Sequence, residues 1–355
     1  MLKWEILPTS EFERLAGAWD ALAASYGCPA FMESRFMRPA IAQLLEGKHH
    51  RLAAGYEAGR LVVAGLLMKL GMGRWSTFQP SQLPLGAWLM APGLDLESAL
   101  ESLCRALPGP VAMLTLTQQD PHMHPRLGGT RRLQTLDYIS TAWVDLDLNG
   151  SFEEFWEARG KNLRQNLRKQ RRKIESEGHA LTVDIATDPE RVAAVFADYA
   201  SLESRGWKLQ QGTAVTAESA QGRFYASALK DFAASGRAIC LALRLDGAPI
   251  AVDLCVRSAD TIVILKTTYD EARKALSPGQ LLHEEAFRHF FALPGLRRVE
   301  FFGRVMEWHT RWTEASRTLF HVNFYRWGAL QSLHGRLRAR RLSAAQAGAA
   351  SAETS

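Results

Sequence analysis

The sequence has few cysteines, no long apolar run and no segment typical of a secretory leader. Its four cysteines lie far apart without the spacing of a metal site or a disulfide framework, which favours a reduced, cytoplasmic setting. The longest apolar runs, such as Leu61–Met68, are far too short to span a bilayer. The first residues, Met1 to Glu5, lack the basic and apolar segments of a signal peptide.

Several common functional motifs are also missing. The pair Gly71-Met-Gly73 lacks the third glycine and the strand–helix context of a dinucleotide-binding turn. His122-Met-His124 and His49-His50 have no carboxylate or cysteine beside them, so we expect no metal. No Ser–His–Asp or Cys–His signature stands out, which favours direct group transfer over a covalent enzyme intermediate.

The chain carries ordinary apolar content and an uneven distribution of positive charge. Its 355 residues, 47% of them hydrophobic, allow two soluble domains with sizeable cores. Much of the net charge of +6 lies in Arg159–Lys173, which has eight basic and no acidic residues, and in Arg336–Arg341. Such clusters attract the phosphates of CoA, nucleotide-linked sugars, tRNA or anionic lipids.

Turn signals and apolar periodicity predict alternating strands and helices in the C-terminal half. A capping box at Ser151 starts a helix that we expect to end at Gly178. The elements expected after it are the strand Leu181–Ile185, helices from Asp188 to Gly206 and from Ser219 to Ser235, the hairpin Ile239–Leu245 and Pro249–Val256, the strand Thr261–Leu265, the helix Gln280–Phe291, and the strands Arg298–Phe302 and Thr318–Tyr325.

The N-terminal half shows a weaker copy of this order. The expected elements are the strand Trp4–Leu7, helices Glu11–Ala24 and Ser34–Leu45, the hairpin Leu52–Glu57 and Arg60–Leu70, the helix Leu96–Leu107 and the strand Val111–Thr117, with Trp143–Leu148 linking the two sheets. We therefore predict a structural duplication, with domains at 1–140 and 141–330 and a basic, then disordered, tail at 331–355.

The most informative segment is a buried strand followed by a glycine turn and a helix. The strand Thr261–Leu265 leads through a polar loop into Ser277-Pro278-Gly279-Gln280-Leu281-Leu282. A helix that starts at such a turn has unpaired backbone N–H groups and a positive dipole end, which together bind phosphate. Neither the Walker nor the dinucleotide spacing is present.

The segment from about residue 150 to 325 resembles FemAB-like proteins with two GNAT domains, of the CelD/BcsL type of bacterial acetyltransferase. The residues that carry the resemblance are, in order, Phe155-Trp156, Lys161 to Arg168, Arg171-Arg172, Glu177-Gly178, Arg205-Gly206-Trp207-Lys208, Pro249-Ile250-Ala251, Lys266 with Tyr269-Asp270, Ser277 to Leu282, Phe302-Gly303, and Glu307-Trp308-His309 with Trp312. Such proteins often have a basic residue after the aromatic of the closing motif, where this chain has His309.

The resemblance implies a mixed α/β fold with two tandem GNAT-like domains, each a mostly antiparallel sheet flanked by helices. It implies an N-acyltransferase, most simply an acetyltransferase, that uses acetyl-CoA or another acyl-CoA as donor and needs no metal. The implied donor site comprises Ser277, Gly279, Gln280 and Leu281, which face the CoA pyrophosphate. Ser277 serves either to bind a phosphate or to cap the helix.

Five residues are candidates for the chemistry. Lys266, at the end of an apolar strand, either stabilises an oxyanion or extends its ammonium group to water. Asp253 interrupts an apolar strand; facing inward it orients Lys266 or acts as a base, and facing outward it is solvated. Tyr269 either protonates the leaving thiolate or packs at the sheet edge. Glu307 and His309 are alternative general bases, although a histidine among tryptophans is often structural.

The acceptor side is expected at the basic helix. Arg164, Arg168 and Arg171 form one stripe, which either clamps an acceptor phosphate or is a solvated face. The resemblance adds Trp207 and Trp308 as substrate-binding residues. Acceptors of the Fem type suggest a phosphate-bearing glycan or peptidoglycan precursor.

Two other functions remain open from the sequence. The donor is an aminoacyl-tRNA in Fem-type transferases, and the basic segments suit tRNA as well as they suit a phosphate-bearing acceptor. A non-catalytic binding protein of the same fold is the other alternative, although Arg159–Lys173 lacks the interleaved aromatics of single-strand binders. Whether the donor is an acyl-CoA or an aminoacyl-tRNA, we expect the N-terminal domain to be a catalytically inactive scaffold.

Overall fold

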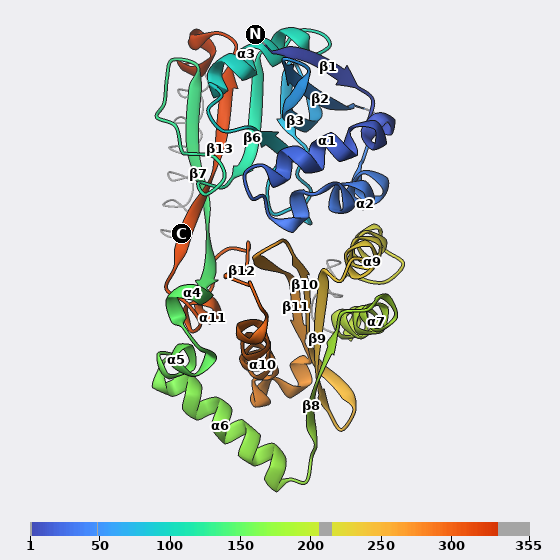
Figure 1. Ribbon diagram of the computed structural model, residues 1–355, viewed down its shortest axis with the longest axis vertical. Coiled ribbons are helices and arrows are strands. Elements are labelled where there is room, and N and C mark those ends of the chain that lie inside the picture. The colour runs from blue at the N-terminus through green and yellow to red at the C-terminus, as the bar shows by residue number, and fades with distance from the viewer. Residues whose placement is uncertain (1, 48, 206–214, 333–355) are drawn as a thin grey trace, which may run out of the picture.

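The computed structural model describes residues 2–47, 49–205 and 215–332, and the tail expected at 331–355 lies almost entirely outside them. The chain forms two α/β lobes stacked along the long axis of the molecule, with two long strands running through both (Figure 1). Each lobe is a mostly antiparallel sheet flanked by helices, so the expected fold class is confirmed. No helix among the described residues has the length and apolar character needed to cross a membrane.

The N-terminal lobe contains six strands and three α-helices among the described residues. They are β1 (Lys3–Leu7), η1 (Thr9–Glu11), α1 (Phe12–Ala24), η2 (Ala30–Met32), α2 (Ser34–Leu44), β2 (His50–Glu57), β3 (Arg60–Gly71), β4 (Arg74–Thr77), β5 (Trp88–Met90), α3 (Leu96–Ala106) and β6 (Met113–Gln119). The sequence pattern did not indicate β4 and β5, which are short.

The C-terminal lobe follows the strand β7 (Leu133–Asp145) and precedes the strand β13 (Ser316–Tyr325). Its elements are α4 (Leu146–Asn149), α5 (Phe152–Glu157), α6 (Lys161–Ser176), β8 (Leu181–Ala186), α7 (Pro189–Arg205), α9 (Ala220–Ala233), β9 (Ala238–Leu245), β10 (Ala248–Arg257), β11 (Thr261–Tyr269), η3 (Glu271–Leu276), α10 (Pro278–Ala292), β12 (Arg298–Glu300) and α11 (Glu307–Thr310).

The two lobes have the same topology. In the N-terminal lobe β1, β2, β3 and β4 pair antiparallel in that order, and β4 then pairs parallel with β6. In the C-terminal lobe β8, β9, β10 and β11 repeat the antiparallel order, and β11 pairs parallel with β12. Each parallel pair is joined by a crossover helix, α3 or α10, because parallel neighbours cannot be joined by a tight turn.

Both lobes also use the same hairpin turn. The β2–β3 hairpin turns at Ala58-Gly59 and the β9–β10 hairpin at Asp246-Gly247, and all four residues have positive φ. Two consecutive positive φ values define the tight turn whose twist matches that of the flanking strands. The residue–glycine pairs in the sequence therefore specify both hairpins.

The last strand of each lobe is exchanged with the other lobe. The strand β7 leaves the N-terminal lobe and pairs with β12 through Trp143, Val144 and Asp145. The strand β13 leaves the C-terminal lobe and pairs with β6. Because β7 and β13 also pair with each other, the strands form one 13-stranded sheet, and the division proposed at residue 140 falls within β7.

Helices from the two lobes share one hydrophobic core. Residues of α1, α2, α7 and α9 bury their apolar faces together with residues of β9 and β10. Phe36 of α2 meets Phe224 of α9 edge to face, with 5.0 Å between ring centroids. Arg237 donates a 2.8 Å hydrogen bond to Glu33 across the same junction. The lobes are therefore joined by packing as well as by the exchanged strands.

The helix expected from Ser151 to Gly178 is in fact two helices, which corrects the sequence prediction. The capping box of Ser151 and Glu154 is present and starts α5. The chain then bends through Ala158, Arg159 and Gly160 before α6 begins. Arg159 stabilises the break, because its guanidinium donates to the carbonyl of Phe155, one of the carbonyls left unpaired at the end of α5.

A buried ion cluster lies where the exchanged strands cross. Arg317 of β13 donates to Asp120, which follows β6, at 2.8 Å and 2.5 Å, and to Glu300 of β12 at 2.9 Å. All three side chains are buried. Burial raises the pKa of Glu300 to about 7, although Arg317 opposes the shift. The cluster connects both lobes through charges that water cannot reach.

We predict that Glu300→Gln flattens the dependence of stability on pH. A carboxyl with a raised pKa adds stability below its unfolded value, about 4.3, and loses it as pH rises through its folded value, about 7. Between pH 5 and pH 8 the wild type should lose about 1 to 3 kcal/mol of unfolding free energy relative to the variant. Urea unfolding at both pH values measures this difference, and parallel profiles would contradict it.

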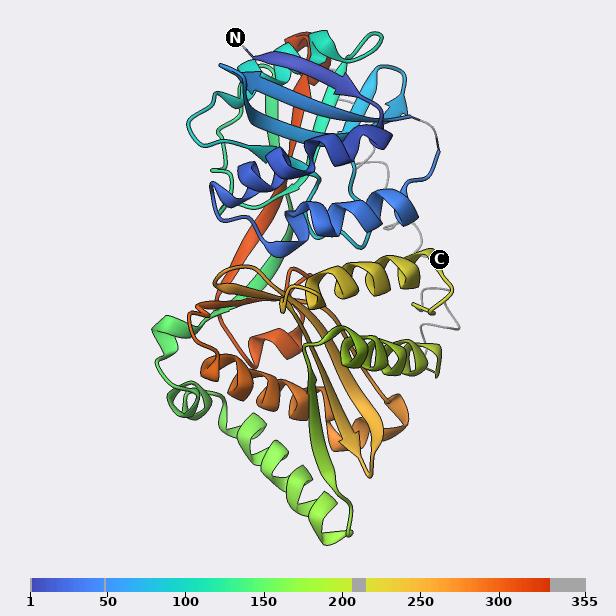
Figure 2. The ribbon, with the colours of Figure 1, turned by 45° about the vertical axis from the view of Figure 1, so that its right-hand side comes forward.

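The helices of the C-terminal lobe cover its sheet unequally. The helices α7 and α9 lie on one face and α10 lies on the other (Figures 1 and 2). Side chains on the α10 face belong to a separate hydrophobic cluster that includes Leu281, Leu282 and Trp312. The candidate site lies on this face, at the start of α10.

Candidate active site

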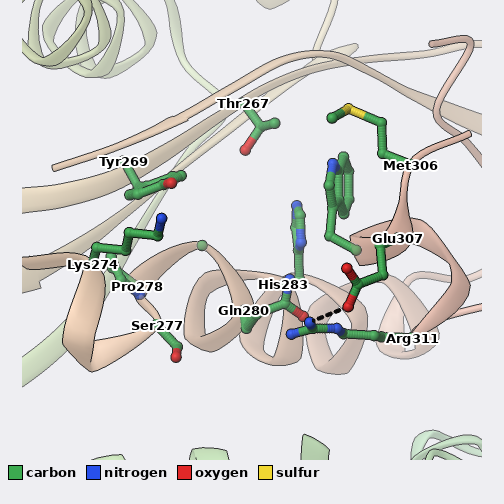
Figure 3. Close-up of a pocket in the computed structure, with 12 residues that line it drawn as sticks. Thr267, Tyr269, Lys274, Ser277, Pro278, Gln280, His283, Met306, Glu307 and Arg311 are labelled. Atoms are coloured by element: carbon green, nitrogen blue, oxygen red, sulfur yellow. Dashed lines mark hydrogen bonds and ion pairs between the residues drawn. The ribbon is translucent and has the colours of Figure 1, made fainter. Parts of the chain in front are cut away.

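A cavity of about 420 Å³ lies at the N-terminus of α10, a size in the range of small-molecule sites. It is bounded by the end of β11, the η3 turn, the first turns of α10 and the segment around α11 (Figure 3). Its lining consists of Thr267, Tyr269, Lys274, Ser277, Pro278, Gly279, Gln280, His283, Met306, Glu307, Trp308 and Arg311. The cavity is therefore built on the strand–turn–helix segment that the sequence singled out.

The turn leaves backbone accessible at the start of the helix. Ser277 adopts a left-handed conformation with φ of 55°, and Pro278, which has no N–H group, opens α10. The amides of Gln280 and Leu281 both donate to the Ser277 carbonyl, at 3.0 Å and 3.1 Å. The amide of Gly279 has no acceptor among the described residues, so it can donate to a ligand at the positive end of the helix dipole.

Glycine at position 279 keeps the cavity open. A Cβ atom placed there would meet only the Tyr269 ring, at 3.7 Å, which is an ordinary contact. A methyl group therefore fits, whereas a large side chain would have to occupy the cavity that Gly279 lines. The glycine is needed for space and not for a strained backbone, since its φ is not positive.

Two cations face the cavity. Arg311 forms a 2.8 Å ion pair with Glu307, one turn earlier. Lys274 has no ion pair in the part of the chain that the structure describes, and Figure 3 shows its side chain extending toward the Tyr269 ring. An unpaired ammonium group beside a helix N-terminus favours an anionic ligand.

The structure places three of the four predicted donor-site residues in the cavity lining. Ser277, Gly279 and Gln280 line it, whereas the Leu281 side chain is fully buried in the core behind it. Gln280 is held in place by Trp312, whose Nε1 donates to its Oε1 at 2.9 Å. Leu281 thus contributes packing, and its amide is taken by Ser277.

Of the candidates for chemistry, Tyr269 and Glu307 line the cavity and Lys266 does not. Side chains alternate along β11, so Thr267 and Tyr269 face α10 while Lys266 faces the other side of the sheet. There the Lys266 ammonium lies 5.6 Å from the centre of the Tyr225 ring of α9. The structure therefore separates Lys266 from any thioester bound at this turn.

Asp253 and His283 meet at the floor of the cavity. Asp253 is fully buried on β10, opposite Thr267 of β11, and shares its sheet face with α10. His283 lines the cavity, and its Nε2 lies 3.3 Å from Oδ2 of Asp253. The expected partnership of Asp253 with Lys266 is thus replaced by one with His283.

His309 has a structural environment. Its Nδ1 accepts a 2.9 Å hydrogen bond from the Met306 amide and so closes the turn of α11. Burial lowers the pKa of His309 to about 4, with His283 adding to the effect and the Met306 hydrogen bond opposing it. It is absent from the cavity lining, whereas the neighbouring Trp308 is part of it.

The basic helix α6 lies beside the donor turn, and its arginines do not form one free stripe. Asn166 Nδ2 donates to Ser277 Oγ at 3.1 Å, which sets α6 against the start of α10. Arg171 is paired with Glu284 at 2.8 Å and Glu285 at 2.5 Å. The expected acceptor clamp is therefore corrected at Arg171, because two carboxylates of α10 already neutralise it.

The other predicted acceptor residues have separate positions. The Arg164 guanidinium donates to the Arg159 carbonyl at the break between α5 and α6. Arg168 is exposed on the same helix. Trp207 lies outside the described residues.

Several lining residues were not anticipated from the sequence. They are Thr267, Lys274, His283, Met306 and Arg311. His283 lies one helical turn after Gly279, so its spacing from the glycine turn was available as a signal. Its partner Asp253 is thirty positions earlier, and only the fold brings the two together.

The N-terminal lobe has a counterpart of this cavity with different chemistry. A cavity of about 230 Å³ lies at the start of α3, the helix equivalent to α10. Here Asp95 caps the helix and accepts from the Ser98 amide at 2.8 Å. Hydrogen bonds from Ser98 lower the pKa of Asp95. A carboxylate at the helix N-terminus repels phosphate, so this lobe lacks the feature that makes the C-terminal turn attractive to an anion.

A family model matches part of the C-terminal lobe. Residues 161–310 match the family model of the acetyltransferase (GNAT) domain, a range that includes α6, β11, α10 and α11. The N-terminal lobe repeats the same strand order, so the fold consists of two tandem GNAT-like domains. Among curated proteins, none matches the chain.

Solved structures with this fold span nearly the whole chain. The C-terminal domain of a protein assigned as a lysylphosphatidylglycerol synthetase of Agrobacterium fabrum has 12% identity and a TM-score of 0.56, over 91% of this chain and 94% of that one. FemX has 9% identity and a TM-score of 0.54, over 93% and 99%. A protein of unknown function from Bacteroides thetaiotaomicron has 9% identity and a TM-score of 0.53, over 92% and 100%. At these identities the likeness establishes the fold.

Proposed function

We propose that this protein is an N-acyltransferase that transfers an acyl group, most simply acetyl, from acyl-CoA to an amine of a polar acceptor. The observation that carries the proposal is the cavity at the start of α10, where the Gly279 amide and the Lys274 ammonium lack partners among the described residues. Both favour the pyrophosphate of CoA. The GNAT domain match over the same segment supports an acyl-CoA donor.

In this proposal the pyrophosphate lies at the turn and the thioester points along the cavity toward Trp308. The acceptor enters from the side of Glu307 and Arg311, which lie across the cavity from Lys274 (Figure 3). Holding donor and acceptor together makes direct transfer an intramolecular event. Tyr269 is placed to protonate the departing thiolate, and Asp95 excludes the N-terminal lobe as a second phosphate site.

Within this function, the acceptor remains a small molecule or a phosphate-bearing glycan or peptidoglycan precursor, as the resemblance to FemAB-like proteins of the CelD/BcsL type suggests. A CoA donor also fits the cytoplasmic setting expected from the cysteines. The sequence placed the positive charge of α6 on the acceptor side. In this proposal it lies on the donor side, because Asn166 of α6 contacts Ser277.

The second candidate is a transferase with an aminoacyl-tRNA donor. The observation that favours it is the outer surface of α6, where Arg168, Lys169 and Arg172 are not buried and form no ion pairs in the described chain. Such a surface would bind a nucleic-acid backbone with strong salt dependence. A non-catalytic binding protein of the same fold is the third candidate.

Titration calorimetry with CoA, acetyl-CoA and deacylated tRNA separates these candidates. Acetyl-CoA binding in the micromolar range, with thiol release when primary amines are added, supports the proposal. Tight tRNA binding together with no binding of either CoA would overturn it in favour of the second candidate. Binding of acetyl-CoA without thiol release from any amine would favour the non-catalytic alternative.

Replacing Lys274 by alanine should weaken CoA binding about threefold to tenfold, and less at high salt, because an exposed ammonium group acts through a screened charge. Calorimetry at two salt concentrations measures both effects. The control is Lys230→Ala on α9, an exposed lysine on the opposite side of the sheet, which should leave the affinity unchanged. Equal affinities for both variants would mean that no phosphate lies near Lys274.

A further inference from the structure

Asp253 and His283 form an isolated polar pair inside an apolar environment. Asp253 is 0% exposed and His283 is 2% exposed. Apart from their own 3.3 Å contact, neither carboxylate oxygen nor either ring nitrogen has a hydrogen-bond partner among the described residues. The pair comes from different elements, β10 and α10, so its meeting depends on the fold.

The surroundings leave His283 as the partner of the carboxylate. The thiols of Cys240 and Cys255 are near enough for Asp253 to raise their pKa values, after burial as the larger cause. Thiols and alkyl groups stabilise a buried carboxylate poorly, and an unpaired buried charge is costly. A costly pair at the floor of a cavity, where an apolar pair would pack equally well, points to a chemical role.

Aromatic rings fix the orientation of His283. Trp308 stacks on it with 5.1 Å between centroids and 19° between planes, and Trp312 meets it edge-on at 5.9 Å. Nε2 is the ring nitrogen within ion-pair distance of Asp253, 3.3 Å from Oδ2, although the contact lacks hydrogen-bond geometry. The nearby carboxylate charge favours a proton on Nε2, which leaves Nδ1 with the basic lone pair. Figure 3 shows the ring standing up from α10 toward Thr267.

We propose that His283 is the general base of the acyl transfer and that Asp253 is the positioning residue that holds it in this tautomer. This inference rests on the proposed function, since it assigns a role within the same cavity. Both ring nitrogens are shielded from bulk water, but the residue lines the cavity, so an acceptor seated there lies next to the ring.

The proposed step balances as follows. The nitrogen of a neutral amine attacks the thioester carbonyl carbon, forming the C–N bond while the carbonyl electron pair moves to oxygen. His283 Nδ1 takes the proton from that nitrogen. The tetrahedral intermediate then collapses, the C–S bond breaks, and the sulfur leaves with the electron pair. The thiolate takes one proton, from the imidazolium or through Tyr269, giving the amide and free CoA.

The other basic groups near the cavity are poorly suited to this step. The Glu307 side chain is 84% exposed and pairs with Arg311. Any contact between its carboxylate and the acceptor therefore takes place in water. The Nδ1 of His309 is occupied by the Met306 amide. Apart from Asp253 on β10, the titratable group that faces His283 is His309 of α11, whose lowered pKa shows that it stays neutral.

The test compares His283→Gln and Asp253→Asn with His289→Gln, a half-buried histidine of the same helix that is absent from the cavity lining. Thiol release from acetyl-CoA is followed with primary amines and with water as the acceptor. His283→Gln should lower kcat about 100-fold or more, with the KM for acetyl-CoA unchanged and the rise of rate with pH abolished. Asp253→Asn should lower kcat about tenfold or more.

A second readout does not depend on substrates. In ¹⁵N-histidine spectra His283 should carry its proton on Nε2 at alkaline pH, and Asp253→Asn should abolish this preference. An unchanged kcat in His283→Gln would overturn the inference. So would a tautomer preference of His283 that stays the same in Asp253→Asn. If the wild type does not bind CoA, the proposed function is overturned instead, and the spectra still report on the pair of His283 and Asp253.

Discussion

Arg317→Ala is expected to lower the free energy of unfolding by about 3 to 5 kcal/mol, the largest loss of stability that we predict for a single substitution. The reason is that Arg317 is the only group donating hydrogen bonds to both Asp120 and Glu300 in the described chain, and all three side chains are buried. Removing it leaves two carboxylates without their partner in a site closed to water.

Urea unfolding followed by tryptophan fluorescence measures this loss, because Trp143 lies against the Arg317 guanidinium, 5.1 Å from ring centre to charge. Arg14→Ala is the matched control, since Arg14 pairs with Glu5 on the surface and should change stability by less than about 1 kcal/mol. A variant that fails to fold confirms the direction, and Arg317→Lys, which keeps the charge, then gives the measurable intermediate. A loss of under 1 kcal/mol for Arg317→Ala would contradict the role of the cluster.

Gly279→Trp is expected to weaken acetyl-CoA binding by about 100-fold or more while leaving the fold intact. Position 279 lines the cavity at the first turn of α10, and the indole ring has to enter the space assigned to the pyrophosphate. The backbone there has no positive φ and no Cβ contact shorter than 3.7 Å, so the backbone and the Cβ atom of the new residue fit without strain. Calorimetry gives the affinity, and thermal unfolding gives the stability.

Gly279→Ala is the matched control for this prediction. Its methyl group makes only an ordinary contact with the Tyr269 ring, so binding should stay within about threefold of the wild type. Alanine also reduces the freedom of the unfolded chain, which should raise stability by about 0.4 to 1 kcal/mol. Unchanged CoA affinity in Gly279→Trp would show that the donor lies elsewhere.

Local signals predicted most elements of the fold. Residue–glycine pairs specify both hairpins, the Ser151 capping box starts α5, and Ser219 caps α9. The prediction went wrong where long-range contacts decide. Arg159 at the break between α5 and α6 also donates to the carbonyl of Trp312, 153 positions away, and the length of β7 depends on β12 and β13 as partners.

The candidate site divides in the same way. Ser277, Gly279, Gln280 and Tyr269 were predictable because a strand, a glycine turn and a helix follow one another in the chain. Lys266 was placed in the site from its position alone, and the irregularity in the β10–β11 pairing just before it turns its side chain to the opposite face. Arg171 looked free in the sequence because its partners Glu284 and Glu285 lie more than a hundred positions away.

The sequence by itself determined the duplicated order of strands and helices and the position of the glycine turn, because these depend on local conformational preference and on which residues are apolar. Only the tertiary structure decided which charges meet. The exchange of β7 and β13 brings Arg317 to Asp120 and Glu300, and the packing of α10 on β10 brings His283 to Asp253. Such pairs join elements that are distant in the chain, so their interaction energies contribute only after the elements have packed.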